Sequence, residues 1–257
     1  MPPSPQRLSG KFRPIDFGSI ISLVPDDCPL VGGQAVAWWA ERYDIHLSSK
    51  NLKTPITSRD IDFWGGRDDL NQMASRLNRR AIYPHSYEMT VWVGAIPMAL
   101  RGFETLIEFI HTVPGLDTNN PDKACVEQEI KCEPGTIRRI PILTPVSLVL
   151  TKLHALRHFD QKDRQDEFHL RVCLESSKSF ITELVENNQI RLALWNIKRL
   201  SHTQTLKSTR RLEIEHGFSI SNAIPLESIR MLCQNASLTE ESQNVLKRFY
   251  EQFTQTS

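Results

Sequence analysis

The chain has 257 residues, of which 40% are hydrophobic and 24% charged, a balance typical of a globular protein with one large or two small domains. Lys and Arg number 31 and Asp and Glu 30, and the net charge of +1 excludes a strongly basic or acidic surface over the whole molecule. The five cysteines lack zinc-ligand spacing, which predicts reduced thiols. No secretory signal or membrane-spanning segment is evident. We therefore expect a cytoplasmic protein with no membrane partner.

The first predicted elements are a short strand, a glycine turn and a helix. Leu30 and Val31 form the strand, Gly32 and Gly33 the turn, and residues 34–43 the helix. The first backbone N–H groups of a helix have no partner within the helix and attract anions. The segment therefore predicts a place where a phosphate could bind.

Two aspartates define the next predicted strand. Asp60 and Asp62 alternate with Ile61 and Phe63. Residues i and i+2 of a strand project from the same face, so both carboxylates are expected to point the same way. Two like charges side by side are unfavourable unless a cation lies between them. The pattern predicts either a metal site or a solvated strand face that keeps the protein soluble.

The rest of the chain divides into a part with strands and a part with helices. Up to residue 143 the pattern predicts one more helix and four strands, at 68–79, 89–93, 105–110, 126–132 and 137–142. Thr144, as an N-cap, and Pro145, at the first helical position, open a helix that runs to about Phe159, and most of the chain beyond it is helical. We expect an α/β domain over 1–143 and a helical domain over 144–257.

Glu108 is an unusual residue for its place in the sequence. It interrupts the run 106–110, which is otherwise apolar on both faces and is therefore expected in the centre of a sheet. A buried carboxylate without a partner is costly, so it needs a cation or a strong donor. An ion pair with an arginine is one solution, and a Mg²⁺ ion shared with the two upstream aspartates is the other. Glu127 and Glu129, in a more polar segment, are rival third carboxylates.

Lys152 occupies an apolar helix face formed by Leu148, Val149, Ala155 and Leu156. A lysine there either extends to water or meets an anion, and a phosphate at the domain junction is one such anion. Lys162, Asp163 and Asp166 then lead into another predicted helix with both acids in its first turn. Stabilisation of the helix dipole is the simple explanation for these acids.

A basic segment lies further along the helical part. Residues 189–211 contain six lysines and arginines and no acid. Such a segment could follow an RNA backbone, or it could be the solvated face of a helix whose Leu192, Trp195 and Leu200 pack inward.

The order of these segments resembles the polymerase-beta-type nucleotidyltransferase superfamily. Within it, the chain is most similar to the stand-alone bacterial group that includes the AbiEii-type toxins of toxin–antitoxin systems. The resemblance covers roughly residues 28–175. The segments that carry it are Leu-Val-Gly-Gly, Asp-Ile-Asp-Phe, Ile-Glu-Phe-Ile-His-Thr-Val-Pro-Gly-Leu, Pro-Val-Ser-Leu-Val-Leu-Thr-Lys-Leu-His-Ala-Leu-Arg and Lys-Asp-Arg-Gln-Asp.

The resemblance implies a mixed sheet with flanking helices and a role for each matching residue. Gly32 and Gly33 would hold the triphosphate of an NTP. Asp60 and Asp62 would bind two Mg²⁺ ions, with the third carboxylate at Glu108, where the family more often has aspartate. The remaining matches are to the phosphate-proximal lysine and the later Lys/Asp motif, at Lys152, Lys162, Asp163 and Asp166.

The function implied by the resemblance is transfer of a nucleoside monophosphate from an NTP to an acceptor hydroxyl. The acceptor would be RNA or the 3′ end of a tRNA, a protein, or a small molecule. A toxin of this group would have a cognate antitoxin protein as its partner. The alternative is a catalytically degenerate nucleotide-binding or regulatory protein of the same fold, because Gly-Gly replaces the family's frequent Gly-Ser and Glu108 replaces aspartate.

Overall fold

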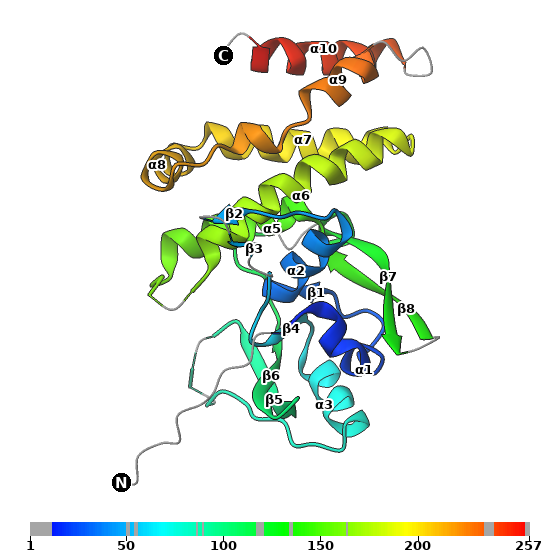
Figure 1. Ribbon diagram of the computed structural model, residues 1–257, viewed down its shortest axis with the longest axis vertical. Coiled ribbons are helices and arrows are strands. Elements are labelled where there is room, and N and C mark those ends of the chain that lie inside the picture. Colours follow the sequence, from blue (N-terminus) through cyan, green and yellow to red (C-terminus); the bar gives the residue numbers. More distant parts are fainter. Residues whose placement is uncertain are drawn as a thin grey trace.

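The computed structural model describes residues 12–49, 52–53, 56–85, 87–88, 90–116, 121–133, 136–162, 164–233 and 239–254. Its centre is a six-stranded mixed sheet with helices around it, and further helices stack beyond one end of the sheet (Figure 1). The mixed α/β architecture predicted from the sequence is confirmed.

The sheet has the strand order β5-β6-β4-β1-β8-β7. The strands are β1 (Leu30–Val31), β4 (Ile61–Trp64), β5 (Trp92–Leu100), β6 (Phe103–Ile110), β7 (Cys125–Glu133) and β8 (Thr136–Leu143). The long hairpins β5–β6 and β7–β8 lie at the two edges, and the short strands β4 and β1 join them in the middle. β4 runs parallel to β6 and antiparallel to β1, and β1 is parallel to β8. A separate hairpin pairs β2 (Ser48–Ser49) with β3 (Leu52–Lys53).

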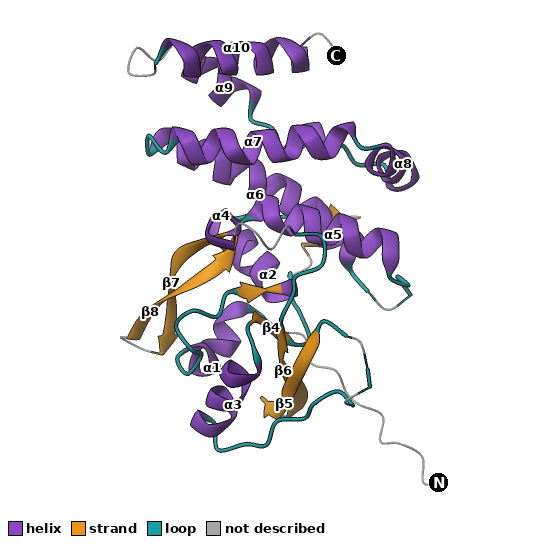
Figure 2. Ribbon diagram, turned by 180° about the vertical axis from the view of Figure 1, so that it is seen from behind, coloured by secondary structure: helices purple, strands orange, loops and turns teal. Residues whose placement is uncertain are grey.

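The helices lie before, between and after these strands in the chain. The structure describes η1 (Pro14–Phe17), α1 (Gly18–Ile21), α2 (Gly32–Arg42), α3 (Arg67–Arg76), α4 (Pro121–Ala124), α5 (Pro145–His158), α6 (Asp166–Glu186), α7 (Ile190–Thr205), α8 (Lys207–His216), η2 (Ile220–Ala223), α9 (Leu226–Cys233) and α10 (Glu240–Thr254). Helices α5 and α6 lie between the sheet and the outer helices α7 to α10 (Figure 2). No helix in the described ranges is long and apolar enough to cross a membrane.

Burial alternates along the two central strands. Ile61 and Phe63 of β4 are fully buried with Phe109 of β6, and the two phenylalanine rings lie 5.6 Å apart. The residues between them, Asp62 and Glu108 among others, are only partly buried. Period-two alternation of this kind separates a core face from a more open face. We call the side that carries Asp62 and Glu108 the site face.

The part of the chain with strands and the part with helices share one core. Every described strand precedes Thr144, whose Oγ1 accepts the backbone N–H of Ser147 at 3.1 Å and caps α5 as predicted. Trp39 of α2 donates its indole N–H to the Leu143 carbonyl at 2.7 Å. A single hydrophobic cluster includes buried residues such as Phe63 and Leu170 from the two parts. The helical part is therefore packed directly onto the helix that begins at the glycine turn.

Candidate active site

Asp62 and Glu108 lie side by side on the site face. The parallel register of β4 and β6 pairs Asp62 with Glu108, and the antiparallel register of β1 and β4 pairs Val31 with Asp62. The rival acids Glu127 and Glu129 lie on β7, with β8 and β1 between that edge strand and β4. Glu108 is therefore the carboxylate that the sheet places beside Asp62.

The two carboxylates affect each other's pKa. Burial is the largest cause that raises the pKa of Glu108 to about 8, and the negative charges of Asp62 and Asp60 raise it further. Burial also raises the pKa of Asp62, against the opposing effect of the Lys152 charge. The side chains of Asp62 and Glu108 are hydrogen-bonded to each other. Near neutral pH the pair therefore holds a shared proton, which is how two adjacent buried acids behave when no cation compensates them.

Asp60 differs from its predicted placement. It lies in a bend one residue before β4 begins, so the strand carries one of the two aspartates rather than both. Its Oδ1 accepts the backbone N–H of Leu106 at 3.0 Å, and its Oδ2 accepts from Arg59 at 3.1 Å. The reason is that a carboxylate at the end of β4 can satisfy a strand N–H of β6 that would otherwise lack a partner. Its charge still raises the pKa of both Asp62 and Glu108.

The glycine turn packs directly against Asp62. Gly32 has a φ of +66°, and a Cβ added to it would lie 1.9 Å from Oδ2 of Asp62. A Cβ on Gly33 would lie 2.6 Å from Oγ of Ser58, and the Gly33 backbone N–H lowers the pKa of Asp62 by hydrogen bonding. Val31, at the N-cap of α2, has no polar side chain to cap the helix. The turn that was predicted to bind a phosphate is thus in contact with the carboxylate that was predicted to bind a metal ion.

Lys152 meets an anion inside the protein. Its side chain is buried, with 8% of the residue exposed, and Nζ donates to Oδ1 of Asp166 at 2.8 Å. Arg164 pairs with the other oxygen of the same carboxylate. Lys152 and Arg164 together hold the pKa of Asp166 below its usual range against the effect of burial. In this structure Asp166 therefore binds Lys152, although the Lys152 charge still reaches Asp62 and lowers its pKa.

The other two predicted substrate-binding residues lie before α6. Lys162 is exposed in the loop after α5, and its backbone N–H donates to Oδ1 of Asp160 at 3.1 Å. The structure thus does not bring Lys162 into the buried group around Lys152. Asp163 lies outside the described residues.

His169 is a residue of the site that the sequence analysis missed. It is 6% exposed, and burial with the nearby Lys152 charge lowers its pKa to about 3. The ring hydrogen-bonds the Thr57 carbonyl, and Nε2 is a buried nitrogen without a partner among the described residues. Cε1 lies 3.3 Å from the position of a Cβ built on Gly33. Its position three residues after Asp166 places both on one helix face, which is the signal that could have found it.

The carboxylate oxygens of the site are ligands of the kind that a hard cation binds, but the described side chains do not form a complete metal site. Oxygen donors are the ligands that Mg²⁺ prefers, and Asp62 and Glu108 carry negative charge that their surroundings leave uncompensated. No group of three or more His, Cys, Asp or Glu side chains in the described ranges is arranged to hold a metal ion. Each oxygen of Asp60 accepts one hydrogen bond, from Leu106 or Arg59, and keeps a lone pair that a cation could bind.

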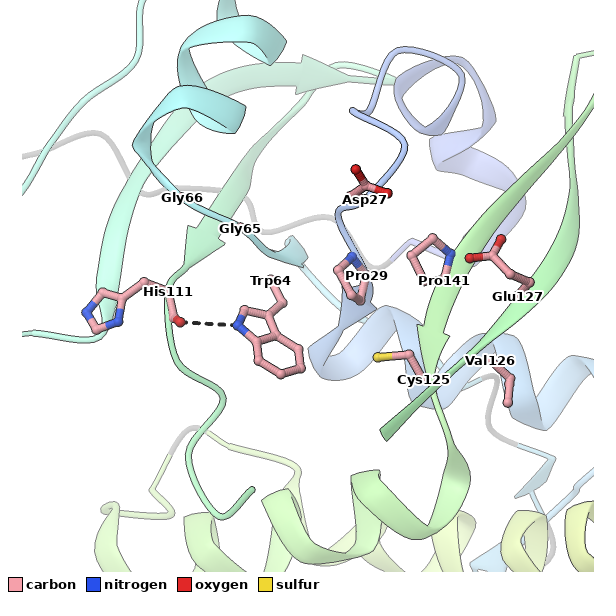
Figure 3. A pocket seen from close by; sticks show the side chains of 10 residues that line it. All are labelled: Asp27, Pro29, Trp64, Gly65, Gly66, His111, Cys125, Val126, Glu127 and Pro141. Carbon is pink, nitrogen blue, oxygen red and sulfur yellow. Dashed lines mark hydrogen bonds between the residues drawn. The ribbon is translucent and has the colours of Figure 1, made fainter. Parts of the chain in front are cut away.

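A cavity of about 780 Å³ lies where β4 ends, at Trp64. Its described lining residues are Asp27, Pro29, Trp64, Gly65, Gly66, His111, Cys125, Val126, Glu127 and Pro141 (Figure 3). Trp64 follows Asp62 by two residues on β4 and therefore projects from the same site face. The cavity therefore begins two residues beyond Asp62 along β4, at the end of the strand opposite Asp60, and neither Asp62 nor Glu108 is among its described lining residues.

Comparison with known proteins adds no relative. No protein-family model matches the chain, and no curated protein matches it. The resemblance to the nucleotidyltransferase superfamily therefore stays a prediction based on the sequence segments that carry it.

Proposed function

We propose that this protein is a Mg²⁺-dependent nucleotidyltransferase that moves a nucleoside monophosphate from an NTP to an acceptor hydroxyl. The observation that carries the proposal is the pair Asp62 and Glu108, paired in register and packed against the glycine turn of Gly32. Adjacent buried acids need a proton or a cation between them, and a helix N-terminus beside them favours a phosphate. A metal-bound nucleotide satisfies both requirements at once.

Each residue has a role in this proposal. The first N–H groups of α2 and the charge of Lys152 would bind and orient the triphosphate, with the N–H of Gly33 given up by Asp62 when the nucleotide binds. Magnesium, two ions by the family resemblance, would be held by Asp60, Asp62 and Glu108, and when bound supplies positive charge at the phosphates. Glu108, when ionised, would accept the proton of the acceptor hydroxyl, and a cation beside the carboxylate pair would favour that ionised form over the protonated one.

A catalytically degenerate nucleotide-binding or regulatory protein is the second candidate. Two observations favour it: Asp60 uses both oxygens within the protein, and Lys152 is bound to Asp166. Such a protein would bind an NTP without releasing pyrophosphate. In the nucleotidyltransferase proposal, Asp60 would instead bind the metal ion through the lone pairs that its hydrogen bonds to Leu106 and Arg59 leave available.

The family resemblance also suggests a cytoplasmic toxin with a cognate antitoxin and an RNA, tRNA, protein or small-molecule acceptor. The basic segment proposed for RNA forms α7 and α8, which lie beyond α5 and α6 from the sheet (Figure 2). Part of its charge is used internally: Arg199 donates to Oγ of Ser147 at 3.0 Å and covers the Trp195 ring, and Arg211 pairs with Glu215.

A labelling experiment tests the proposal. Wild-type protein, the Asp62→Asn/Glu108→Gln double variant and the control Asp68→Asn, an exposed aspartate on α3, are incubated with Mg²⁺ and each α-³²P-labelled NTP. Total RNA, total protein and small-molecule acceptors are supplied in separate reactions. Label in an acceptor with the wild type and the control, but not with the double variant, supports the proposal. Mg²⁺-dependent NTP binding by calorimetry with no label and no pyrophosphate release favours the degenerate protein, and the absence of both label and binding overturns both candidates.

A further inference from the structure

We propose that His154 and His158, in the last two turns of α5, bind a late first-row transition-metal ion such as Ni²⁺ or Zn²⁺. Two residues four positions apart on a helix project from the same face, one turn from each other. This inference goes beyond the proposed nucleotidyltransferase function and does not depend on it, because the site uses neither the carboxylates nor the glycine turn.

The first argument is the separation of the two imidazole rings. Their centres lie 4.4 Å apart, and the ring planes are inclined by 39°. At metal–nitrogen distances of about 2.0 to 2.1 Å, two imidazoles that share one ion have ring centres roughly 4.5 to 5 Å apart. A small rotation of the side chains therefore brings one nitrogen of each ring onto a common ion.

The second argument is that one of the two ligands is already held in place. His154 is half-buried, and a Cβ added to Gly115 would lie 2.8 Å from its own Cβ. The His154 ring also meets the Phe159 ring edge to face, at 6.1 Å between centres. His158 is exposed and can turn toward the fixed ring. A pair with one fixed ligand loses less side-chain entropy when it binds an ion.

The third argument is that both rings are available as ligands. In the part of the chain that the structure describes, neither imidazole has a hydrogen-bond or ion-pair partner. Burial, with the charges of His158 and Arg157, lowers the pKa of His154, so this ring is neutral near pH 7. A neutral imidazole offers one nitrogen lone pair to a metal ion. Arg157 is directed to α8, where its guanidinium donates to Oγ1 of Thr209 at 2.6 Å.

The ligand type selects the metal. Imidazole suits Ni²⁺, Cu²⁺ and Zn²⁺, whereas Mg²⁺ prefers carboxylate and water oxygens. The histidine pair and the carboxylates Asp62 and Glu108 are therefore sites for different ions. Within the described ranges no third His, Cys, Asp or Glu joins the histidine pair. Water would fill the remaining coordination positions, so the ion would stay accessible, unlike the closed four-ligand sites of structural zinc.

Metal binding would stabilise the end of α5. The last carbonyl groups of a helix have no partner within the helix, and its last turn is the part that frays. An ion held by both histidines joins the last two turns and favours the folded state by mass action. Because α5 also carries Lys152, the metal would stabilise the helix that positions one of the proposed phosphate-binding residues.

The first experiment titrates the wild-type protein with Ni²⁺ by calorimetry. His154→Gln and His158→Gln are compared with the control His202→Gln, which changes an exposed histidine on α7. We expect each variant of the pair to bind Ni²⁺ at least about tenfold more weakly, because a single imidazole loses the effective concentration that its neighbour supplies. The control should bind Ni²⁺ like the wild type. Mn²⁺ should bind the pair more weakly than Ni²⁺, and Mg²⁺ should not compete with it.

The second experiment locates the bound ion. In a histidine-selective NMR spectrum, a small amount of paramagnetic Ni²⁺ should broaden the ring signals of His154 and His158 and leave that of His202 sharp. The urea midpoint of the wild type should rise with Ni²⁺, and that of His158→Gln should not. The Asp62→Asn/Glu108→Gln double variant should bind Ni²⁺ like the wild type.

Three results would overturn the proposal. The first is equal Ni²⁺ affinity in the wild type and in both variants of the pair. The second is an equal loss of affinity in His202→Gln, which would mean that Ni²⁺ binds exposed histidines without selection. The third is loss of Ni²⁺ binding in the Asp62→Asn/Glu108→Gln protein, which would place the ion at the carboxylates. Nucleotide transfer is tested separately, by the labelling experiment.

Discussion

Two pairs of charged residues, Lys152 with Asp166 buried and Asp62 with Glu108 partly buried, are compensated in opposite ways. Lys152 and Asp166 are opposite charges at 2.8 Å, and the pKa of Asp166 is lowered. Asp62 and Glu108 are like charges, and the pKa of each is raised. Burial penalises all four groups, so the difference comes from the partner that each one has. The fold gives Asp166 two cationic partners, whereas Asp62 and Glu108 depend on a proton or a cation.

The largest expected effect comes from breaking the compensated pair. Lys152→Met leaves Asp166 buried with Arg164 as its remaining partner. We expect the free energy of unfolding to fall by about 3 kcal/mol, the lower range for removing one member of a buried ion pair. Lys162→Met, in the exposed loop, is the control and should change stability by less than about 0.5 kcal/mol. Urea denaturation measures both. A Lys152→Met protein as stable as the wild type would mean that Arg164 alone compensates Asp166.

The second prediction concerns the glycine turn. In Gly32→Ala the new Cβ would lie 1.9 Å from Oδ2 of Asp62, at a φ of +66°. We expect a loss of about 2 kcal/mol or more, of which the left-handed backbone alone accounts for about 1 kcal/mol. Gly102→Ala is the matched control, since its φ is +82° and no described atom lies within 4 Å of its Cβ position. Both variants are measured by denaturation and by calorimetry with Mg²⁺ and NTP. Mg²⁺-dependent NTP binding should be lost only in Gly32→Ala. Normal binding in the Gly32→Ala protein would mean that the glycine turn takes no part in nucleotide binding.

The third prediction uses pH to test the uncompensated pair. The pKa of Glu108 is raised from its ordinary value of 4.5 to about 8, so the folded state holds a proton that the unfolded state releases. Without Mg²⁺, the free energy of unfolding should therefore fall by roughly 2 to 4 kcal/mol as the pH rises from about 5 to above 8. Asp166 does not titrate in this window, because its pKa is lowered.

Mg²⁺ and a variant identify the source of this pH dependence. Mg²⁺ should reduce the loss, because a cation replaces the shared proton. Glu108→Gln should remove the loss with or without Mg²⁺. A stability that is flat from about pH 5 to about pH 8.5 in metal-free wild-type protein would contradict the proposed charge repulsion.

Local patterns in the sequence were sufficient for the elements that frame the site. The strand Leu30–Val31, the helix after it and the Thr144 cap depend on neighbouring residues, and the structure has them, although the helix begins at Gly32 rather than after the two glycines. The interior position of Glu108 was inferred from an apolar run, and β6 does lie between β5 and β4. The length of the β5–β6 hairpin was missed, because it depends on a turn at Arg101 and Gly102, both with positive φ.

The contacts of the site residues could not be read from the same patterns. Asp60 accepts the N–H of Leu106, which is 46 residues away, and that bond exists only because β4 and β6 are adjacent. The sequence predicted that Lys152 would meet an anion but not that the anion is Asp166. Hydrophobic periodicity could not identify His169 as a site residue. What distinguishes His169 is a buried ring nitrogen without a partner in the described structure, and this is a tertiary feature.

The effect expected to be smallest near neutral pH is at His169, because this histidine gains a proton only at acidic pH. The ring donates to the Thr57 carbonyl and leaves Nε2 without a partner in the described residues, so the proton is on Nδ1. Its pKa is lowered to about 3, against about 6.5 for an unperturbed histidine, so stability should decline only as the pH falls from 6.5 toward 3. Histidine-selective NMR should show a neutral ring with the proton on Nδ1 at about pH 5.5 and about pH 7.5, with other histidines of the chain as reference.

A charged His169 at about pH 5.5 would contradict the comparison between the two pairs, because it would add a second cation beside Lys152 and the turn. A neutral ring has a more specific consequence. An unprotonated Nε2 accepts a hydrogen bond and cannot donate one to a phosphate oxygen, so a nucleotide hydroxyl is the group it can hold. If nucleotide binding exposes the buried Nε2, wild-type protein should prefer the ribonucleotide to its 2′,3′-dideoxy analogue, and His169→Phe should lower ribonucleotide affinity to that of the analogue. Equal affinities in the wild type would remove His169 from the site and leave the turn, the carboxylates and Lys152 as its full extent.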